Sequence, residues 1–223
     1  MKQASEFLSK DELATIEAAV VNAEKKTSVE IVPVVATASG RYDRAEDIVG
    51  LWFGATLMVV LWMLWPVIPT ALGDWGAAFP LNYFGWIAAL VGGFILGATI
   101  ASRVGWLRRL FTPQREMTEE VERRAREAFF DQRIHHTEGA TGVLIYVSLY
   151  ERKVCLLTDD AVQKVLPEGE IKRLCDALTA KLGSTAADGL VECITVLGDK
   201  LTDPLPRADD DVDELDNAVV LID

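Results

Sequence analysis

Two polar turns hold the side chains in this sequence that are best suited to acid–base or metal chemistry. His136 and Glu138 lie just before a strongly apolar segment, and Asp159 and Asp160 lie just after the next one. Those segments are expected to pair as antiparallel strands, so the start of the first lies beside the end of the second. Carboxylates and an imidazole there could act as general acid and base or hold Ca²⁺ or Mg²⁺. The candidate catalytic residues are therefore Asp159, Asp160 and His136, and the candidate metal ligands are Glu138, Asp159 and Asp160.

The same residues also have a simpler interpretation, because solvated turns at a helix end and a strand end use these residue types. A second row of candidate ligands, Glu127, Asp131 and His135, has the four-residue spacing of one helix face. That spacing is equally typical of a solvated face. The sequence has no G-x-S-x-G, no phosphate-cradling glycine loop, no H-E-x-x-H and no reactive cysteine motif. No cofactor is assigned from motifs, and Ca²⁺ or Mg²⁺ is the one cofactor left open.

The segments that would position these side chains alternate between helix and strand patterns. Ser9 and Glu12 have the spacing of a capping box, which begins a helix. The expected helices cover residues 9–26, 114–134, 167–183 and 186–202, and the expected strands cover residues 28–38, 142–149, 153–158 and 217–222. Pro33 cannot donate to a β-ladder, so the first strand is expected at an edge or with a bulge. This order predicts a layered α/β domain.

Two long apolar runs interrupt that domain. No charged residue occurs from Ile48 to Gly73, and after Asp74 none occurs until Arg103. Each run exceeds the ~20 residues that a helix needs to cross a bilayer. A soluble core would have to be far larger to bury both runs, and the polar first 45 residues exclude a signal peptide. We predict a transmembrane hairpin with spans at about 48–69 and 82–103.

The second span carries small residues at every fourth position. A stripe of this kind lets two helix backbones approach closely in lipid. The stripe consists of Gly85, Ala89, Gly93, Gly97 and Ala101, and the first span offers Gly50 and Gly54 in the same register. Packing within the hairpin, contact with a second copy and contact with another membrane protein are all compatible with this pattern.

The arginines near the spans predict an orientation. They lie on the side of the soluble segments, whereas the loop joining the spans, around Asp74 to Pro80 and expected outside, contains no Lys or Arg. The arginines concerned are Arg41, Arg44, Arg103, Arg108, Arg109 and Arg115. By the positive-inside rule, both termini and the soluble domain are cytoplasmic, at the inner (plasma) membrane. Trp52 and Trp106 are expected near the inner boundary, and Trp65 and Trp75 near the outer one.

The formal charge of -12 argues against nucleic-acid binding, which needs clustered Lys and Arg. Six acidic residues fall within the eight positions 209–216, and we interpret this run as a solvated, flexible tail without the spacing of an EF-hand. The three cysteines form no C-x-x-C pair and are interpreted as small core residues in a reducing compartment.

These patterns divide the chain into four parts, with the hairpin inserted into the soluble domain. The parts are residues 1–47 (first part of the soluble domain), 48–106 (hairpin), 107–203 (second part of the soluble domain) and 204–223 (acidic tail). Both halves of the soluble domain must meet for it to fold.

Four segments of the soluble domain carry a family pattern, namely TSVEIVPVV, GVLIYVS, ERKVCLL and VLPEGEI, within residues 10–36 and 114–203. Together they resemble the TPM domain of bacterial membrane proteins and of thylakoid-lumen proteins linked to photosystem repair. The resemblance implies a three-layer α/β/α domain with a short mixed sheet. It also implies one of two activities, because some relatives are described as acid phosphatases and others as assembly or quality-control factors.

The sequence departs from this family at the turns that could carry chemistry. Relatives often have an acidic, Asn-containing turn before the GVL strand, thought to help bind a divalent cation, but here the turn reads HHTEGATG. A glycine-rich turn often follows the third strand, and here Thr158, Asp159 and Asp160 stand there. Relatives also usually place the domain outside the cytoplasm.

Two functions follow as hypotheses. In the first, the chain is a membrane-tethered binding, assembly or quality-control accessory whose partners are the lipid bilayer and another membrane protein or a second copy. In the second, it is a cation-assisted acid phosphatase that uses Asp159, Asp160, Glu138 and His136. Nucleic acid is not an expected partner.

Overall fold

The computed structural model describes residues 3–64, 83–183, 186–208 and 212–223. The chain divides into two compact units, Met1–Gly40 with Arg115–Asp223, and Arg41–Gln114. The predicted outer loop, the positions of Trp65 and Trp75 and the three aspartates 209–211 lie outside the described residues.

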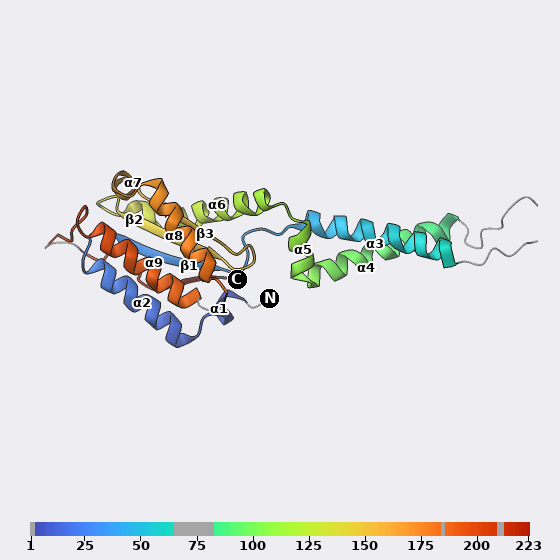
Figure 1. The fold of residues 1–223 in the computed structure, drawn as a ribbon, viewed down its shortest axis with the longest axis horizontal. Coiled ribbons are helices and arrows are strands. Elements are labelled where there is room, and N and C mark those ends of the chain that lie inside the picture. The colour runs from blue at the N-terminus through green and yellow to red at the C-terminus, as the bar shows by residue number, and fades with distance from the viewer. Residues whose placement is uncertain (1–2, 65–82, 184–185, 209–211) are drawn as a thin grey trace, which may run out of the picture. The chain divides into compact units, whose positions relative to one another are not determined.

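A four-stranded mixed sheet forms the centre of the larger unit (Figure 1). The strands are β1 (Glu30–Ala36), β2 (Gly142–Ser148), β3 (Lys153–Thr158) and β4 (Val220–Ile222). Their order is β3-β2-β1-β4, with β1 parallel to both β2 and β4 and with β3 antiparallel to β2. Strands β2 and β3 thus form the antiparallel β-hairpin that the short polar turn between them predicts.

The first strand corrects one expectation, because β1 is central and pairs in unbroken register with β2 from Glu30↔Gly142 to Ala36↔Ser148. Pro33 therefore marks neither an edge strand nor a bulge. The other neighbour, β4, begins to pair only at Val34. The side of β1 away from β2 has no β4 partner at the level of Pro33, so the missing N–H of this proline is tolerated there.

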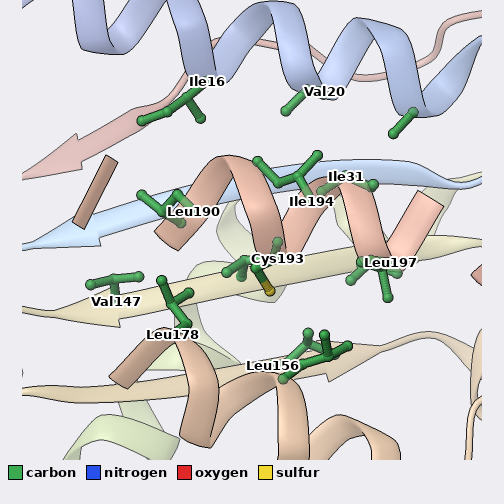
Figure 2. Close-up of a cluster of buried hydrophobic side chains, with 14 of the residues drawn as sticks. Ile16, Val20, Ile31, Val147, Leu156, Leu178, Leu190, Cys193, Ile194 and Leu197 are labelled. Atoms are coloured by element: carbon green, nitrogen blue, oxygen red, sulfur yellow. The ribbon is translucent and has the colours of Figure 1, made fainter. Parts of the chain in front are cut away.

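Helices cover one face of the sheet with α2 (Lys10–Glu24), α8 (Glu168–Lys181) and α9 (Ala186–Leu201). Figure 2 shows Ile194 of α9 and Val20 of α2 directed toward Ile31 of β1. All three side chains are at most 1% exposed. Burying a side chain of this size contributes about 1.5–3 kcal/mol. The cluster on this face is the larger of the two apolar clusters of the domain.

The opposite face is covered by α6 (Gln114–Asp131) and the short 3-10 helix η1 (Ile134–His136). Val121, Ala125 and Ala128 of α6 recur on one side and pack against Leu144 and Tyr146 of β2. The larger unit is therefore a three-layer α/β/α domain. Two short helices complete it, α1 (Ala4–Phe7) and α7 (Asp160–Val165).

The smaller unit consists of α3 (Asp43–Leu64), α4 (Tyr83–Arg103) and α5 (Gly105–Phe111), with α5 in contact with both longer helices. Both α3 and α4 contain a stretch long and apolar enough to cross a membrane. Helix α3 begins at Asp43, among charged residues and before the predicted start of the span at residue 48. The predicted end of that span, at residue 69, lies outside the described residues.

Candidate functional site

The two polar turns predicted from the sequence do lie side by side. Val143 pairs with Thr158, and the Asp159 N–H donates to the Gly142 carbonyl at 2.9 Å. The Ala161 N–H donates to the Ala140 carbonyl at 3.0 Å. The end of β3 and the turn before β2 are thus joined by backbone hydrogen bonds.

The candidate residues in these turns have separate roles. Asp159 is the N-cap of α7 and its Oδ1 accepts from the Asp160 N–H at 2.8 Å. Its Oδ2 and the Nδ1 of His135 are buried and have no hydrogen-bond partner in the described part of the chain. The His136 ring lies 4.2 Å from the His135 ring, centroid to centroid. Asp160, His136 and Glu138 are exposed.

These residues do not gather into a three-ligand group. Among the described residues, one set of three acidic, imidazole or thiol groups has ligand atoms within 4.8 Å of one another, and it consists of Glu24, Glu30 and Asp213. The family-type cation implied by the resemblance thus finds no such ligand set at Glu138, Asp159 and Asp160. We name Glu24, Glu30 and Asp213 the acidic triad.

The acidic triad is built where α2 turns into β1. Glu24 is the last residue of α2 and Glu30 is the first of β1. The segment after α9 runs across this turn, since the Thr27 hydroxyl donates to the Leu205 carbonyl at 2.6 Å and the Ser28 N–H donates to the same carbonyl at 3.1 Å. Arg207 Nη1 donates to the Glu24 carbonyl at 3.0 Å.

The acidic tail continues from there across the ends of the two central strands. The N–H groups of Glu214 and Leu215 donate to the Glu30 carboxylate at 3.4 and 3.3 Å. The Glu214 carboxylate accepts from the Glu138 N–H, at 3.1 Å to each oxygen. Residues 204–223, expected to be a flexible tail, therefore include a stretch that docks on β1 and on the turn before β2.

The Glu24 carboxylate lies in an unusual environment. The residue is 6% exposed, and its Oε1 accepts from the Ile31 N–H at 3.0 Å, whereas its Oε2 is buried with no hydrogen-bond partner among the described residues. Burial, and then the negative charges of Glu30 and Asp213, raise the pKa of Glu24 to about 8, against the opposing effects of the Ile31 N–H and the Arg207 guanidinium.

Sequence reasoning missed the acidic triad because none of its members stands out locally. Glu24 reads as a residue at a helix end and Glu30 as one polar position in an apolar strand. Asp213 was assigned to a solvated run. The available signal was Glu30 itself, because a carboxylate within a central strand is rarely buried without a partner.

A second buried polar network lies at the opposite end of β1 and β2. The Glu151 Oε1 accepts from the N–H groups of Ser39 and Gly40 at 2.9 and 3.2 Å, and its Oε2 accepts from the Ser148 hydroxyl. The Ser39 hydroxyl donates to Ser148 Oγ at 3.0 Å and lies 3.2 Å from the Tyr146 hydroxyl. This network fixes the chain where it leaves β1, which is a structural role.

The cysteines have the core role expected of them. Cys193 is buried, and Cys155 and Cys175 are partly buried. Burial raises the pKa of Cys155 and of Cys193 to about 12, so these thiols stay protonated at neutral pH. They are unsuited to nucleophilic catalysis.

In the smaller unit, glycines of the predicted stripe face glycines of α3. A Cβ on Gly93 would lie 2.8 Å from the Gly54 Cα, and a Cβ on Gly97 would lie 3.0 Å from the Gly50 Cα and 2.6 Å from the Phe53 Cβ. Ala101 is buried, whereas Gly85 and Ala89 are partly exposed. The glycine contacts are therefore made between α3 and α4 of one chain.

The geometry defines a class of protein, namely a three-layer α/β/α domain whose two central parallel strands are separated in sequence by an apolar helical hairpin. Residues 107–200 match the TPM domain family. The match begins in α5 and ends in α9, so β1 and β4 lie outside it.

One solved structure supports the fold. The NMR structure of the BA42 protein from the psychrophilic bacterium Bizionia argentinensis superposes with a TM-score of 0.56 at 19% identity and covers 99% of each chain. At this identity the likeness concerns the fold alone. Curated proteins gave no match to the chain.

Proposed function

We propose that this chain is an integral TPM-domain protein of the bacterial inner membrane, in which α3 and α4 cross the bilayer as a hairpin. The hairpin holds the α/β domain at the cytoplasmic face, where it serves as a binding and assembly module for a membrane complex. The apolar surface of α3 and α4 is the observation that carries this proposal.

That surface is too large for a water-soluble unit. Only 17% of each apolar window in α3 and α4 is buried within the chain. Large exposed apolar side chains are spread along both helices, and monomeric soluble proteins rarely show contiguous apolar patches of this extent. They include Leu51, Trp52, Val59, Trp62, Phe84, Ile87, Val91, Ile95 and Leu96. Lipid tails are a suitable surrounding for them.

Helix α5 suits the membrane interface. Trp106 and Leu110 are 70% and 69% exposed, and Arg109 lies between them in the sequence. An indole ring favours the headgroup level, where its ring is half buried and its N–H meets water. We therefore assign α5 to the inner membrane surface, at the end of α4.

The orientation rests on charge. Both ends of the hairpin that continue into the α/β domain carry arginines, whereas the segment between the spans carries none. Reporter fusions at Asp223 test it in a bacterial host. A C-terminal fluorescent protein should fluoresce, and a C-terminal alkaline phosphatase should stay inactive. The reverse pattern would place the domain outside the cytoplasm.

The binding role rests on two features. Both ends of the hairpin continue into the α/β domain, and α4 has faces that are directed away from α3. A photo-crosslinking residue in place of Leu96, which is 57% exposed, should give one defined adduct with another membrane protein in native membranes. The adduct should disappear with Gly93→Leu, which breaks the seam with α3. Adducts with lipid only would contradict a binding role, and an adduct with a second copy would identify self-association.

The alternative, a cation-assisted acid phosphatase, stays a prediction. Asp159 Oδ2 and His135 Nδ1 are the polar atoms near the two turns that lack a partner in the described part of the chain. Hydrolysis of a phosphomonoester between pH 4 and 8 with Mg²⁺, Ca²⁺ or Mn²⁺, abolished by Asp159→Ala, would establish this activity. No hydrolysis under any of these conditions would exclude it.

A further inference from the structure

Glu24 presents an energetic problem that the fold alone does not solve. A buried carboxylate oxygen without a hydrogen-bond partner costs stability, more so when other carboxylates lie nearby. Oε2 of Glu24 is such an atom, and Glu30, itself 5% exposed, lies within 4.8 Å of Glu24, measured between one carboxylate oxygen of each. Asp213 approaches both from the tail at the same range.

A proton on Glu24 would solve only part of this problem. It would remove the charge, but Oε2 makes no hydrogen bond with any described residue in this structure. A cation would use the oxygen as a ligand instead. Ligand oxygens lie about 2.3–2.6 Å from Ca²⁺, so oxygens of one site are separated by up to roughly 5 Å. The triad meets this condition without rearrangement.

We infer that Glu24, Glu30 and Asp213 form a binding site for a hard divalent cation, Ca²⁺ or Mg²⁺, which fastens the acidic tail to the junction between α2 and β1. All three ligands are carboxylates, and hard cations prefer oxygen ligands. Asp213 is exposed, so water completes the coordination from that side. This site is separate from the two polar turns, and it does not depend on the proposed membrane function.

The surrounding charges agree with a divalent ion. Among the described residues, the three carboxylates lie near one guanidinium, that of Arg207, which donates to the Glu24 carbonyl. Glu30 is already held by two N–H groups of the tail, and Asp213 accepts from Asn217 Nδ2 at 2.8 Å. The ligands are thus positioned by the tail's own hydrogen bonds, and the ion would join the tail to the domain through both ends of the α2–β1 turn.

Binding of Ca²⁺ alone, and of Mg²⁺ alone, to the full chain in detergent after chelator treatment tests the inference by calorimetry. The wild-type chain should bind one ion. Glu24→Gln and Asp213→Asn should each weaken binding by at least about 10-fold, the loss that even outer-shell changes cause. The matched control is Asp216→Asn, which removes a charge from the same tail. Among the described residues the Asp216 carboxylate accepts from the nearby Ala218 N–H, so this variant should bind as the wild type does.

Hydrogen exchange supplies a second readout that is independent of affinity. The ion should slow amide exchange at Glu214 and Leu215 in the wild type but not in Asp213→Asn. Because Asp213 is exposed, misfolding would not explain a loss of this effect in the variant. Absence of binding by both ions up to millimolar concentration would overturn the inference. So would equal binding by all three variants, or an equal loss in Asp216→Asn, which would indicate diffuse attraction to the tail.

Discussion

The N–H of Leu215 donates to the carboxylate of Glu30 at 3.3 Å, across 185 residues of sequence. This contact joins the acidic tail to the first residue of a central strand. It places Asp213 next to the junction of α2 and β1, and it directs the following residues toward β4 at the sheet edge. The stability of the tail is therefore tied to the charge state of buried carboxylates.

The stability of the cation-free chain should fall as pH rises. The pKa of Glu24 is raised from its ordinary value of 4.5 to about 8 in the folded chain, mainly by burial. A carboxyl whose folded pKa is raised contributes fully below its unfolded pKa, and the contribution is lost as pH rises through the folded pKa. We expect unfolding in chelator to become easier from pH 5 to pH 8, by up to about 1.4 kcal/mol per pH unit.

Urea unfolding of Glu24→Gln measures this effect against the wild type. The variant keeps an acceptor for the Ile31 N–H but cannot ionise, so its stability should vary less with pH over this window. Asp216→Asn should keep the wild-type slope. Identical slopes in the wild type and Glu24→Gln would show that Glu24 does not titrate with a raised pKa.

The glycine seam in the hairpin gives a matched pair of substitutions. Gly93→Ala would set a methyl group 2.8 Å from the Gly54 Cα, whereas a Cβ on Gly92 meets nothing within 4 Å. Overpacking of this kind costs about 1–3 kcal/mol. Thermal unfolding in detergent should show a lower midpoint for Gly93→Ala and an unchanged midpoint for Gly92→Ala. Equal midpoints would mean that α3 and α4 do not pack along this seam.

Removal of one hydroxyl from the network around Glu151 should destabilise the α/β domain. Ser148 donates to Glu151 Oε2 in a fully buried position, so Ser148→Ala leaves that oxygen short of a donor. The expected loss in the free energy of unfolding is about 1–3 kcal/mol. Thr195→Ala removes an exposed hydroxyl that donates to the Val191 carbonyl, and should cost much less. A comparable loss in both variants would contradict the buried role of Ser148.

The thiols should be inert in the folded chain. Burial raises the pKa of Cys155 and Cys193 to about 12, and alkylation requires the thiolate. Iodoacetamide at pH 8 should therefore leave both unmodified for hours and label them promptly once urea is added, as read by mass spectrometry of their peptides. Rapid labelling of Cys193 in the native chain would require local opening of α9.

The sheet and its flanking helices were largely predictable because their patterns are local. GVLIYVSL is almost wholly apolar, as a strand covered on both faces is expected to be, and α6 repeats small and apolar residues at helical spacing. The prediction of an edge strand or a bulge at Pro33 was wrong. Whether a strand can contain a proline depends on where the neighbouring strand begins, and the proline itself does not encode that. Asp159 was interpreted as a strand-end residue, although an acidic residue before Asp-Ala-Val is a typical helix N-cap.

Glu30 gave a local signal, but the acidic triad as a whole was not predictable, because it depends on contacts distant in sequence. Thr27 and Leu205 must meet before the tail can reach Glu30, and nothing in either local sequence specifies that meeting. The polar turns at Glu138 and Asp159 were placed correctly relative to one another. Their side chains nevertheless serve as a cap and as exposed turn residues, which is a matter of rotamer and burial rather than of topology.

The interruption between β1 and β2 has a consequence for how the chain is made. A ribosome completes β1 before the hairpin and β2 only after it, so the nascent chain carries seven buried-type residues of β1 without their main partner. An unpaired apolar strand is prone to aggregation during this interval. The sheet closes only after α3 and α4 have been synthesised, which makes completion of the α/β domain a late event in biogenesis.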